Sequence, residues 1–120
     1  MPFTVEYDEE RSCILVTCSG DLDLQLVEST ATEVSSMIAR TGCRLILNDL
    51  RCAQLTRDAF KVYKIPRIMT EVGIGSGVRR ALVVGDHQEE FHFLETVFLN
   101  YGNDVRMFAD IQDAEAWLFV

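Results

Sequence analysis

The sequence has no apolar stretch approaching the roughly 18 residues that would span a bilayer. Its first eight residues lack the basic and apolar regions of a secretory signal. The four cysteines form no C-x-x-C pair and the two histidines lie far from them, so neither a zinc site nor a redox dithiol is indicated. Buried, reduced thiols in a cytoplasmic protein are the simplest interpretation.

Basic residues are also scarce, because 11 Lys and Arg stand against 19 Asp and Glu, a formal charge of −8. Duplex nucleic acid is therefore not expected as the main partner, since its phosphates require an excess of cations. There is no G-x-S-x-G motif, and Gly73-x-Gly75-x-Gly77 precedes a predicted strand, whereas a nucleotide-binding motif follows one. We predict that the protein is not an enzyme and has no catalytic residues, metal or cofactor.

Along the sequence, the spacing of apolar residues switches between the two-residue period of strands and the period of helices. Hydrophobic residues make up 48% of the 120 residues and charged residues 25%, typical of one globular domain spanning 1–120. Alternating apolar residues predict a strand over 3–7, and an apolar run predicts a second over 12–18. Apolar residues at helical spacing predict a helix over 24–38, ended by Gly42.

The same patterns continue to the end of the chain. Further strands are predicted at 44–49, 80–85 and 105–108. Further helices are predicted from Thr56, from Asp86 to Gly102, and from Asp110 onward, the last docking through Trp117. Pro66 breaks or restarts the first of these near Ile65. The order β-β-α-β-α-β-α-β-α predicts an α/β fold with a mixed sheet of about five strands and four helices, because parallel strands need helical crossovers.

Functional sites in such sheets collect at the carboxyl ends of the strands, which here points to the predicted loop 48–58. The loop has one hydroxyl residue, Thr56, where a helix N-cap is expected. As an N-cap, Thr56 would stabilise the helix by about 1 kcal/mol. As a phosphoacceptor, it would place roughly two negative charges beside Arg57. Both roles are open at this point.

Three short motifs point to a known family. They are Gly20-Asp21-Leu22-Asp23, Asp49-Leu50-Arg51, and Phe108-Ala109-Asp110 followed by Ala114 and Trp117-Leu118. Over nearly its whole length the sequence resembles the STAS-domain superfamily, named for sulfate transporters and anti-sigma-factor antagonists, and looks closest to its SpoIIAA-like branch. The resemblance implies a small sheet flanked by helices that acts by binding.

The resemblance also implies a regulatory position. In anti-sigma-factor antagonists, a partner kinase phosphorylates a serine in the loop after the third strand, and this switches partner binding. Counted without gaps from Asp49, the family's Asp falls on Gln54, its two serines on Leu55 and Thr56, and its Gly on Arg57. Thr56 alone keeps a hydroxyl among these positions, so the resemblance implies Thr56 as the regulatory phosphoacceptor.

The net charge is unevenly distributed along the chain. Residues 1–39 carry −7, residues 40–80 carry +6, and residues 81–120 carry −7. Four cations of the middle third recur at helical spacing: Arg57, Lys61, Lys64 and Arg67. On one continuous helix they would form a stripe, which is either a solvated face or a docking surface for acidic groups.

Two functions follow as hypotheses. The first is a non-enzymatic regulatory module that docks an acidic protein partner or a second copy of itself, as a homodimer. The residues expected to contact the partner or an anion are Asp49, Arg51, Arg57, Lys61, Lys64 and Arg67. The alternative, suggested by the similarity of this branch to Sec14-type lipid-binding domains, is capture of a lipid or small amphiphile. The expected apolar pocket consists of Phe60, Tyr63, Ile65, Ile68 and Met69.

Overall fold

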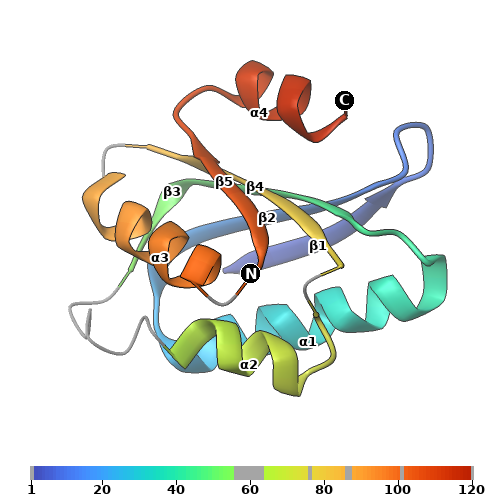
Figure 1. Ribbon diagram of the computed structural model, residues 1–120, viewed down its shortest axis with the longest axis horizontal. Helices are drawn as coiled ribbons and strands as arrows, with labels where there is room; N and C mark the ends of the chain where they lie inside the picture. Colours follow the sequence, from blue (N-terminus) through green and yellow to red (C-terminus); the bar gives the residue numbers. More distant parts are fainter. Residues whose placement is uncertain (1, 56–63, 76, 86–87, 101, 120) are drawn as a thin grey trace.

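A five-stranded sheet forms the centre of the computed structural model, which describes residues 2–55, 64–75, 77–85, 88–100 and 102–119 (Figure 1). The strands are β1 (Phe3–Asp8), β2 (Cys13–Leu22), β3 (Leu45–Leu55), β4 (Arg79–Val84) and β5 (Asp104–Phe108). They lie in the order β1-β2-β3-β4-β5, with β1 antiparallel to β2 and the other pairs parallel. The predicted mixed sheet is confirmed.

Helices cover both faces of this sheet. They are α1 (Leu24–Thr41), α2 (Ile65–Glu71), α3 (Gln88–Asn100) and α4 (Ile111–Leu118). Helices α1, α2 and α3 lie on one face, and α4 lies on the other (Figure 1). Among the described residues, each parallel crossover contains a helix, as is usual for connections between parallel strands. The predicted order of strands and helices is confirmed.

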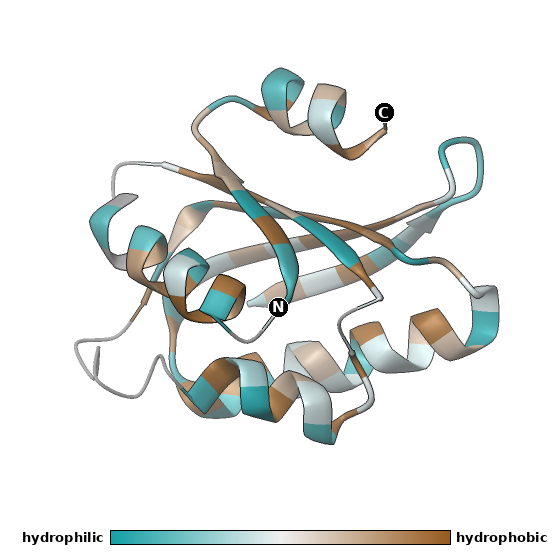
Figure 2. Ribbon diagram, in the orientation of Figure 1, coloured by the Kyte–Doolittle hydropathy of each residue, from teal (hydrophilic) through white to brown (hydrophobic). Residues whose placement is uncertain are grey.

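The strand alternation divides the buried side chains between two cores, because successive residues of a strand point to opposite faces. On β4, Leu82 and Val84 join the larger core under α1, α2 and α3, whereas Ala81 and Val83 join the smaller core under α4. The apolar sides of the helices face the sheet and their polar sides face outward (Figure 2). None of the helices among the described residues combines the length and apolarity needed to cross a membrane.

Two residues, Asp23 and Gly42, define the ends of α1. The Asp23 side chain accepts a hydrogen bond from the Leu26 backbone N–H at 2.8 Å, which caps the first turn. Gly42 ends the helix with a φ of 72°, a left-handed conformation that glycine adopts without strain. The last residue of the Gly20–Asp23 motif therefore has a structural role as a helix cap.

The interpretation of residues 48–58 as a loop is wrong for 48–55, because β3 continues to Leu55. Strand β2 likewise continues to Leu22, and the two strands pair from Ser19 with Cys52 to Leu22 with Leu55. Non-local pairing thus outweighs the turn preference of the Asn and Asp residues at the start of this segment. Cys52 is exposed on this extension, so the expectation that every cysteine is buried is also wrong.

Two predicted helix features need refinement. Helix α2 begins at Ile65, and Pro66 lies in its first turn, where the missing N–H of proline is not needed. Pro66 is therefore compatible with the start of this helix. The expected helix start at Thr56 lies outside the described residues. In α4 the deeply buried anchor is Leu118, which is 1% exposed, whereas Trp117 is half-buried beside Phe108, with ring centroids 5.7 Å apart.

Candidate functional site

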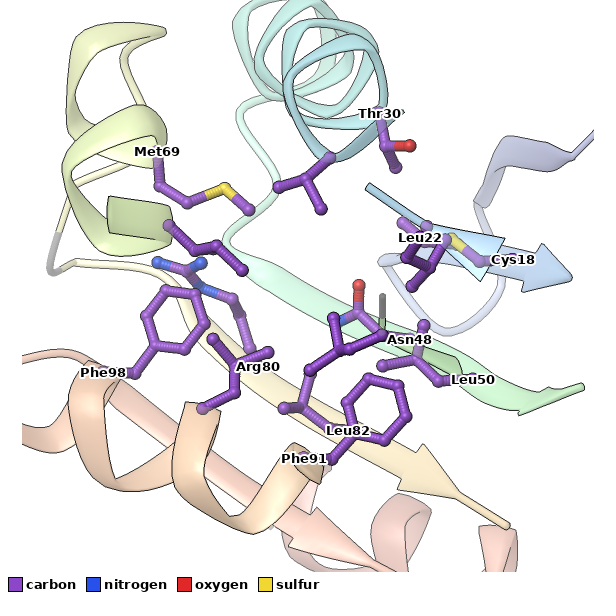
Figure 3. Close-up of a pocket in the computed structure, with 15 residues that line it drawn as sticks. Cys18, Leu22, Thr30, Asn48, Leu50, Met69, Arg80, Leu82, Phe91 and Phe98 are labelled. Carbon is purple, nitrogen blue, oxygen red and sulfur yellow. The ribbon is translucent and has the colours of Figure 1, made fainter. Parts of the chain in front are cut away.

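A cavity of about 80 Å³ lies between the sheet and helices α1, α2 and α3 (Figure 3). Strands β2, β3 and β4 form its floor, and the three helices form its roof and walls. Its lining is aliphatic and aromatic apart from four residues: Cys18, Thr30, Asn48 and Arg80. Arg80 is the one ionisable cation among them, which makes it the chemically distinctive feature of the cavity.

Strand alternation places Arg80 inside the protein. It precedes Leu82 and Val84 on the same side of β4, and its side chain is only 4% exposed. The guanidinium carbon lies 4.7 Å from the centre of the Phe98 ring, and Nη2 donates to Oδ1 of Asn103 at 3.0 Å. Nε has no hydrogen-bond partner among the described residues. Arg80 is thus a buried cation with a donor that no described residue accepts from.

The charge of Arg80 is poorly compensated. Burial lowers the pKa of its guanidinium to about 10, which still leaves it protonated at neutral pH. No carboxylate of the described residues forms an ion pair with it. A buried charge without a counter-charge is costly, because the low-dielectric interior replaces its hydration incompletely. The cavity beside Arg80 is therefore suited to a negatively charged group.

The expected apolar pocket agrees with this cavity only in part. Ile65 and Met69 line the cavity from α2, whereas Ile68 is half-buried and does not line it. Phe60 and Tyr63 lie outside the described residues. Arg80 was missed from the sequence, although a charged residue inside an otherwise apolar strand was the signal that could have identified it.

The expected docking residues are not gathered on one surface. Asp49 is two residues after Leu47 on β3 and so lies on the same side of the sheet, the side covered by α4. Arg51 donates to the Asp49 carboxylate through Nε and Nη2 at 2.9 and 2.8 Å. The Arg51 guanidinium lowers the pKa of the Asp49 carboxyl. Lys64 immediately precedes α2 and Arg67 belongs to it, on the opposite face of the sheet. The structure therefore separates the Asp49–Arg51 pair from the α2 cations.

The cations near α2 can be placed only in part. Lys64 is exposed at the start of the helix, and Arg67 forms an ion pair with Glu71 at 3.3 Å. The remaining two members of the predicted stripe, Arg57 and Lys61, lie outside the described residues. Whether the four cations form one stripe therefore stays a prediction.

The expected phosphoacceptor, Thr56, also lies outside the described residues, but the strand end that precedes it is defined. Gln54 donates from Nε2 to Oδ1 of Asp21, its partner across the strands β2 and β3. Leu55 is buried and lines the cavity. The Gly20–Asp23 motif, at the end of β2, therefore lies beside the end of β3 at Ala53–Leu55.

By sequence, no protein-family model and no curated protein matches the chain. By structure, it is similar to an uncharacterised DUF3478-family protein with a SpoIIAA-like fold from Shewanella loihica PV-4, at 18% identity over 97% of this chain and 91% of that one, with a TM-score of 0.62. An anti-sigma factor antagonist from Mycobacterium paratuberculosis is 14% identical over 97% of this chain and 93% of its own, with a TM-score of 0.61.

The anti-sigma factor antagonist SpoIIAA, in its unphosphorylated form, is 17% identical over 96% of both chains, with a TM-score of 0.55. At identities this low, the likeness establishes the fold, whereas function has to be argued from the site. The similarity covers nearly all of each chain, and the observed sheet flanked by helices agrees with what the family resemblance implied. The chain therefore has a SpoIIAA-like fold.

Proposed function

We propose that the protein is a cytoplasmic, non-enzymatic regulatory module that binds an acidic protein partner. The observation that carries this proposal is the full-length similarity of its fold to two anti-sigma factor antagonists. The paired ends of β2 and β3 support it, because they bring the Gly20–Asp23 motif beside Ala53–Leu55, the residues that precede Thr56 in the sequence. Binding at strand ends is common in sheets with parallel crossovers.

The proposed docking surface consists of the strand extension and the start of α2. Beyond Leu50 and Val84, the last paired residues of β3 and β4, the extension continues as a ribbon of β2 and β3. Asp21 and Gln54 are exposed on it, and Lys64 is exposed at the start of α2. Asp49 and Arg51 contribute less in this proposal, because each already neutralises the other.

Phosphorylation of Thr56 is the proposed regulatory event. SpoIIAA is known in both an unphosphorylated and a phosphorylated form. A phosphate on Thr56 would add roughly two negative charges beside Arg57 and weaken the attraction of an acidic partner. Peptide mass spectrometry of protein from its own cells is expected to detect phosphorylated Thr56. Unmodified Thr56 under several growth conditions would argue against this switch and leave partner binding itself untouched.

Affinity capture from the protein's own cells tests partner binding. We expect the wild-type protein to retain an acidic protein, and the double variant K64E/R67E to retain several-fold less of it, because the charges of two exposed cations, at the N-cap and in the first turn of α2, are reversed. R106E is the matched control, since Arg106 is an exposed cation on β5, away from α2. Equal capture by the double variant and the wild type would contradict the proposed surface.

Binding of a lipid or small amphiphile is a second candidate function, favoured by the cavity under α2. Ile65 and Met69 supply an apolar wall there, and Arg80 supplies a cation. A ligand with an apolar chain and an anionic head would match both. Native mass spectrometry of freshly purified protein is expected to show a retained small molecule, and a spectrum with only the mass of the polypeptide counts against this function.

A further inference from the structure

The two edges of the sheet differ in how they are protected. At one edge, the carboxylate of Glu95 on α3 accepts a hydrogen bond from the Met107 backbone N–H of β5 at 2.6 Å. The carboxylate therefore occupies a position where a further strand would bond. At the other edge, β1 pairs with β2 on one side, and the described part of the chain places no strand on its outer side. Strand β1 is thus the open edge of the sheet.

The register of β1 shows which of its backbone groups face outward. Pro2 lies opposite Ser19, whose N–H donates to the Pro2 oxygen at 2.9 Å, and the register continues without a shift along β1. In an antiparallel pair, hydrogen-bonded positions alternate with positions whose N–H and C=O point away from the partner strand. Counted from Pro2, the backbone groups of Phe3, Val5 and Tyr7 therefore point to the open side of β1.

Strand β1 lacks the features that commonly prevent the addition of another strand. Natural edge strands are often protected by proline, lysine or a bulge within the strand. The six residues of β1 include neither proline nor lysine, and their pairing with β2 is unbroken. Each of the three outward residues offers one N–H donor and one C=O acceptor. An extended segment of similar length therefore finds a full set of main-chain partners along this edge.

The side chains of β1 indicate the chemistry of such a segment. Phe3, Val5 and Tyr7 are half-buried and pack against the larger core, so apolar side chains opposite them would extend that core. On the other face of the sheet, Thr4 and Glu6 are exposed. Glu6 forms no ion pair with any described residue. A cation opposite Glu6 would supply the missing opposite charge.

The charge around β1 favours a basic segment over a second copy of the chain. Residues 1–39 carry −7, and their single basic residue, Arg11, is already paired with Asp8 and Glu115. Pairing of β1 with β1 of a second copy would bring two such segments together, and like charges repel. A segment that carries Lys or Arg is attracted to the same surface instead.

We propose that β1 binds an extended segment of a partner protein in which apolar residues alternate with Lys or Arg, so that the segment adds a strand to the sheet. The apolar residues lie opposite Phe3, Val5 and Tyr7, and the cations lie on the face of Thr4 and Glu6. Main-chain hydrogen bonds supply affinity in this mode of binding, and alternate side chains supply specificity. The site is separate from the surface at the start of α2, which is proposed to bind an acidic protein.

Two synthetic peptides with blocked ends, KVKVKVK and EVEVEVE, are the probes, because they share three valines and differ in charge. In two-dimensional NMR of the full chain at constant ionic strength, KVKVKVK is expected to shift the N–H resonances of Phe3, Val5 and Tyr7 saturably. EVEVEVE is expected to bind at least about tenfold more weakly, since like charges then face each other. KVKVKVK with N-methylated valines is expected not to bind, because it lacks the N–H donors that strand addition requires.

Variants of β1 test the backbone and the charge separately. V5P removes one outward N–H, and proline is tolerated in an edge strand where the N–H points away from the sheet. It is therefore expected to fold and to lose KVKVKVK binding. E6K is expected to weaken this binding several-fold, and E33K is the matched control because Glu33 is an exposed residue of α1 with the same charge. If V5P does not fold, the N-methylated peptide makes the same test on the wild-type protein.

Each failure would contradict a different part of the proposal. Equal binding of KVKVKVK and EVEVEVE would overturn the basic character of the partner. Binding that survives N-methylation of the valines would be electrostatic adhesion and would overturn strand addition. Shifts of the same three N–H resonances with protein concentration alone would make a second copy the occupant. Absence of KVKVKVK binding would overturn the proposal as a whole, while binding of an acidic protein near α2 would be unaffected.

Discussion

Burial decides which of the cysteine side chains are available for chemistry. Cys13 and Cys18 are buried, and the loss of hydration raises the pKa of each thiol to about 11. Cys43 is also buried, whereas Cys52 is exposed on the ribbon formed by β2 and β3. The thiolate is the reactive form of cysteine, so the two raised pKa values make Cys13 and Cys18 inert at neutral pH.

The raised thiol pKa values predict a loss of stability in alkaline solution. Between about pH 9 and about pH 11, thiols of the unfolded chain are ionised while Cys13 and Cys18 of the folded protein keep their protons. The folded state then binds more protons, so the free energy of unfolding falls as the pH rises through this window. Urea unfolding at several pH values measures it. The free energy of unfolding of the double variant C13A/C18A is expected to fall less steeply with pH than that of the wild type. An equal slope would contradict the assignment of the effect to these two thiols.

A close backbone contact predicts a large effect at Gly85. A Cβ at this position would lie 2.8 Å from the backbone oxygen of Arg51, so one strand end would have to move. We expect G85A to lower the free energy of unfolding by about 1–3 kcal/mol, the usual cost of overpacking. G75A is the matched control, because a Cβ at Gly75 meets nothing within 4 Å. Chemical denaturation compares the two, and similar stabilities would refute the contact.

At the scale of whole elements, local patterns were sufficient to predict type and order but not extent. The period of apolar residues identified the strands and helices, and Gly42 marked the end of α1 because capping is local. The N-cap role of Asp23 was not predicted, although it is equally local. The end of β3 depends on pairing with β2, in which β3 has one residue more than β2 between the pairs Thr17–Asp49 and Ser19–Cys52. No local pattern encodes such a bulge.

The candidate site was harder to predict for the same reason. The apolar residues of α2 were recognisable from their spacing, and two of them, Ile65 and Met69, line the cavity. The position of Arg80 in the cavity depends on which strand is central and which face the helices cover. Both are properties of the assembled sheet, so the sequence of β4 alone could not show that this cation is buried without a carboxylate partner.

The packing of α4 against the sheet predicts that substitution of Leu118 lowers the free energy of unfolding much more than substitution of Leu99. Leu118 is 1% exposed and packs with Ala114 against Leu47, Ala81 and Val83 of the sheet. We expect L118A to reduce the free energy of unfolding by about 2–5 kcal/mol, because it removes buried methyl groups and leaves a cavity.

The matched control is L99A, since Leu99 of α3 is 51% exposed, and the same substitution there is expected to change stability by about 0.5 kcal/mol or less. Thermal or urea unfolding compares the two variants. Comparable losses in both would mean that α4 is not held to the sheet through Leu118.

At the scale of the whole molecule, several cations of the basic middle third, residues 40–80, are paired within the protein or buried. Arg51 pairs with Asp49, Arg67 with Glu71 and Arg79 with Asp104, while Arg80 is buried. Charges that are paired internally add little to the attraction of a partner. The electrostatic part of docking therefore depends on a few exposed cations, including Lys64, and association through them should be weak and sensitive to salt.

A second copy of the chain is one acidic partner that the proposal allows, because both outer thirds carry −7. At about 0.05 M salt we expect sedimentation to detect a weak dimer, and at about 0.5 M mostly monomer, since the screening length falls several-fold at high ionic strength. K64E/R67E is expected to weaken the dimer at low salt, and R106E to leave it unchanged. A monomer at every salt concentration would exclude self-association and leave a different acidic protein as the partner to be found by affinity capture.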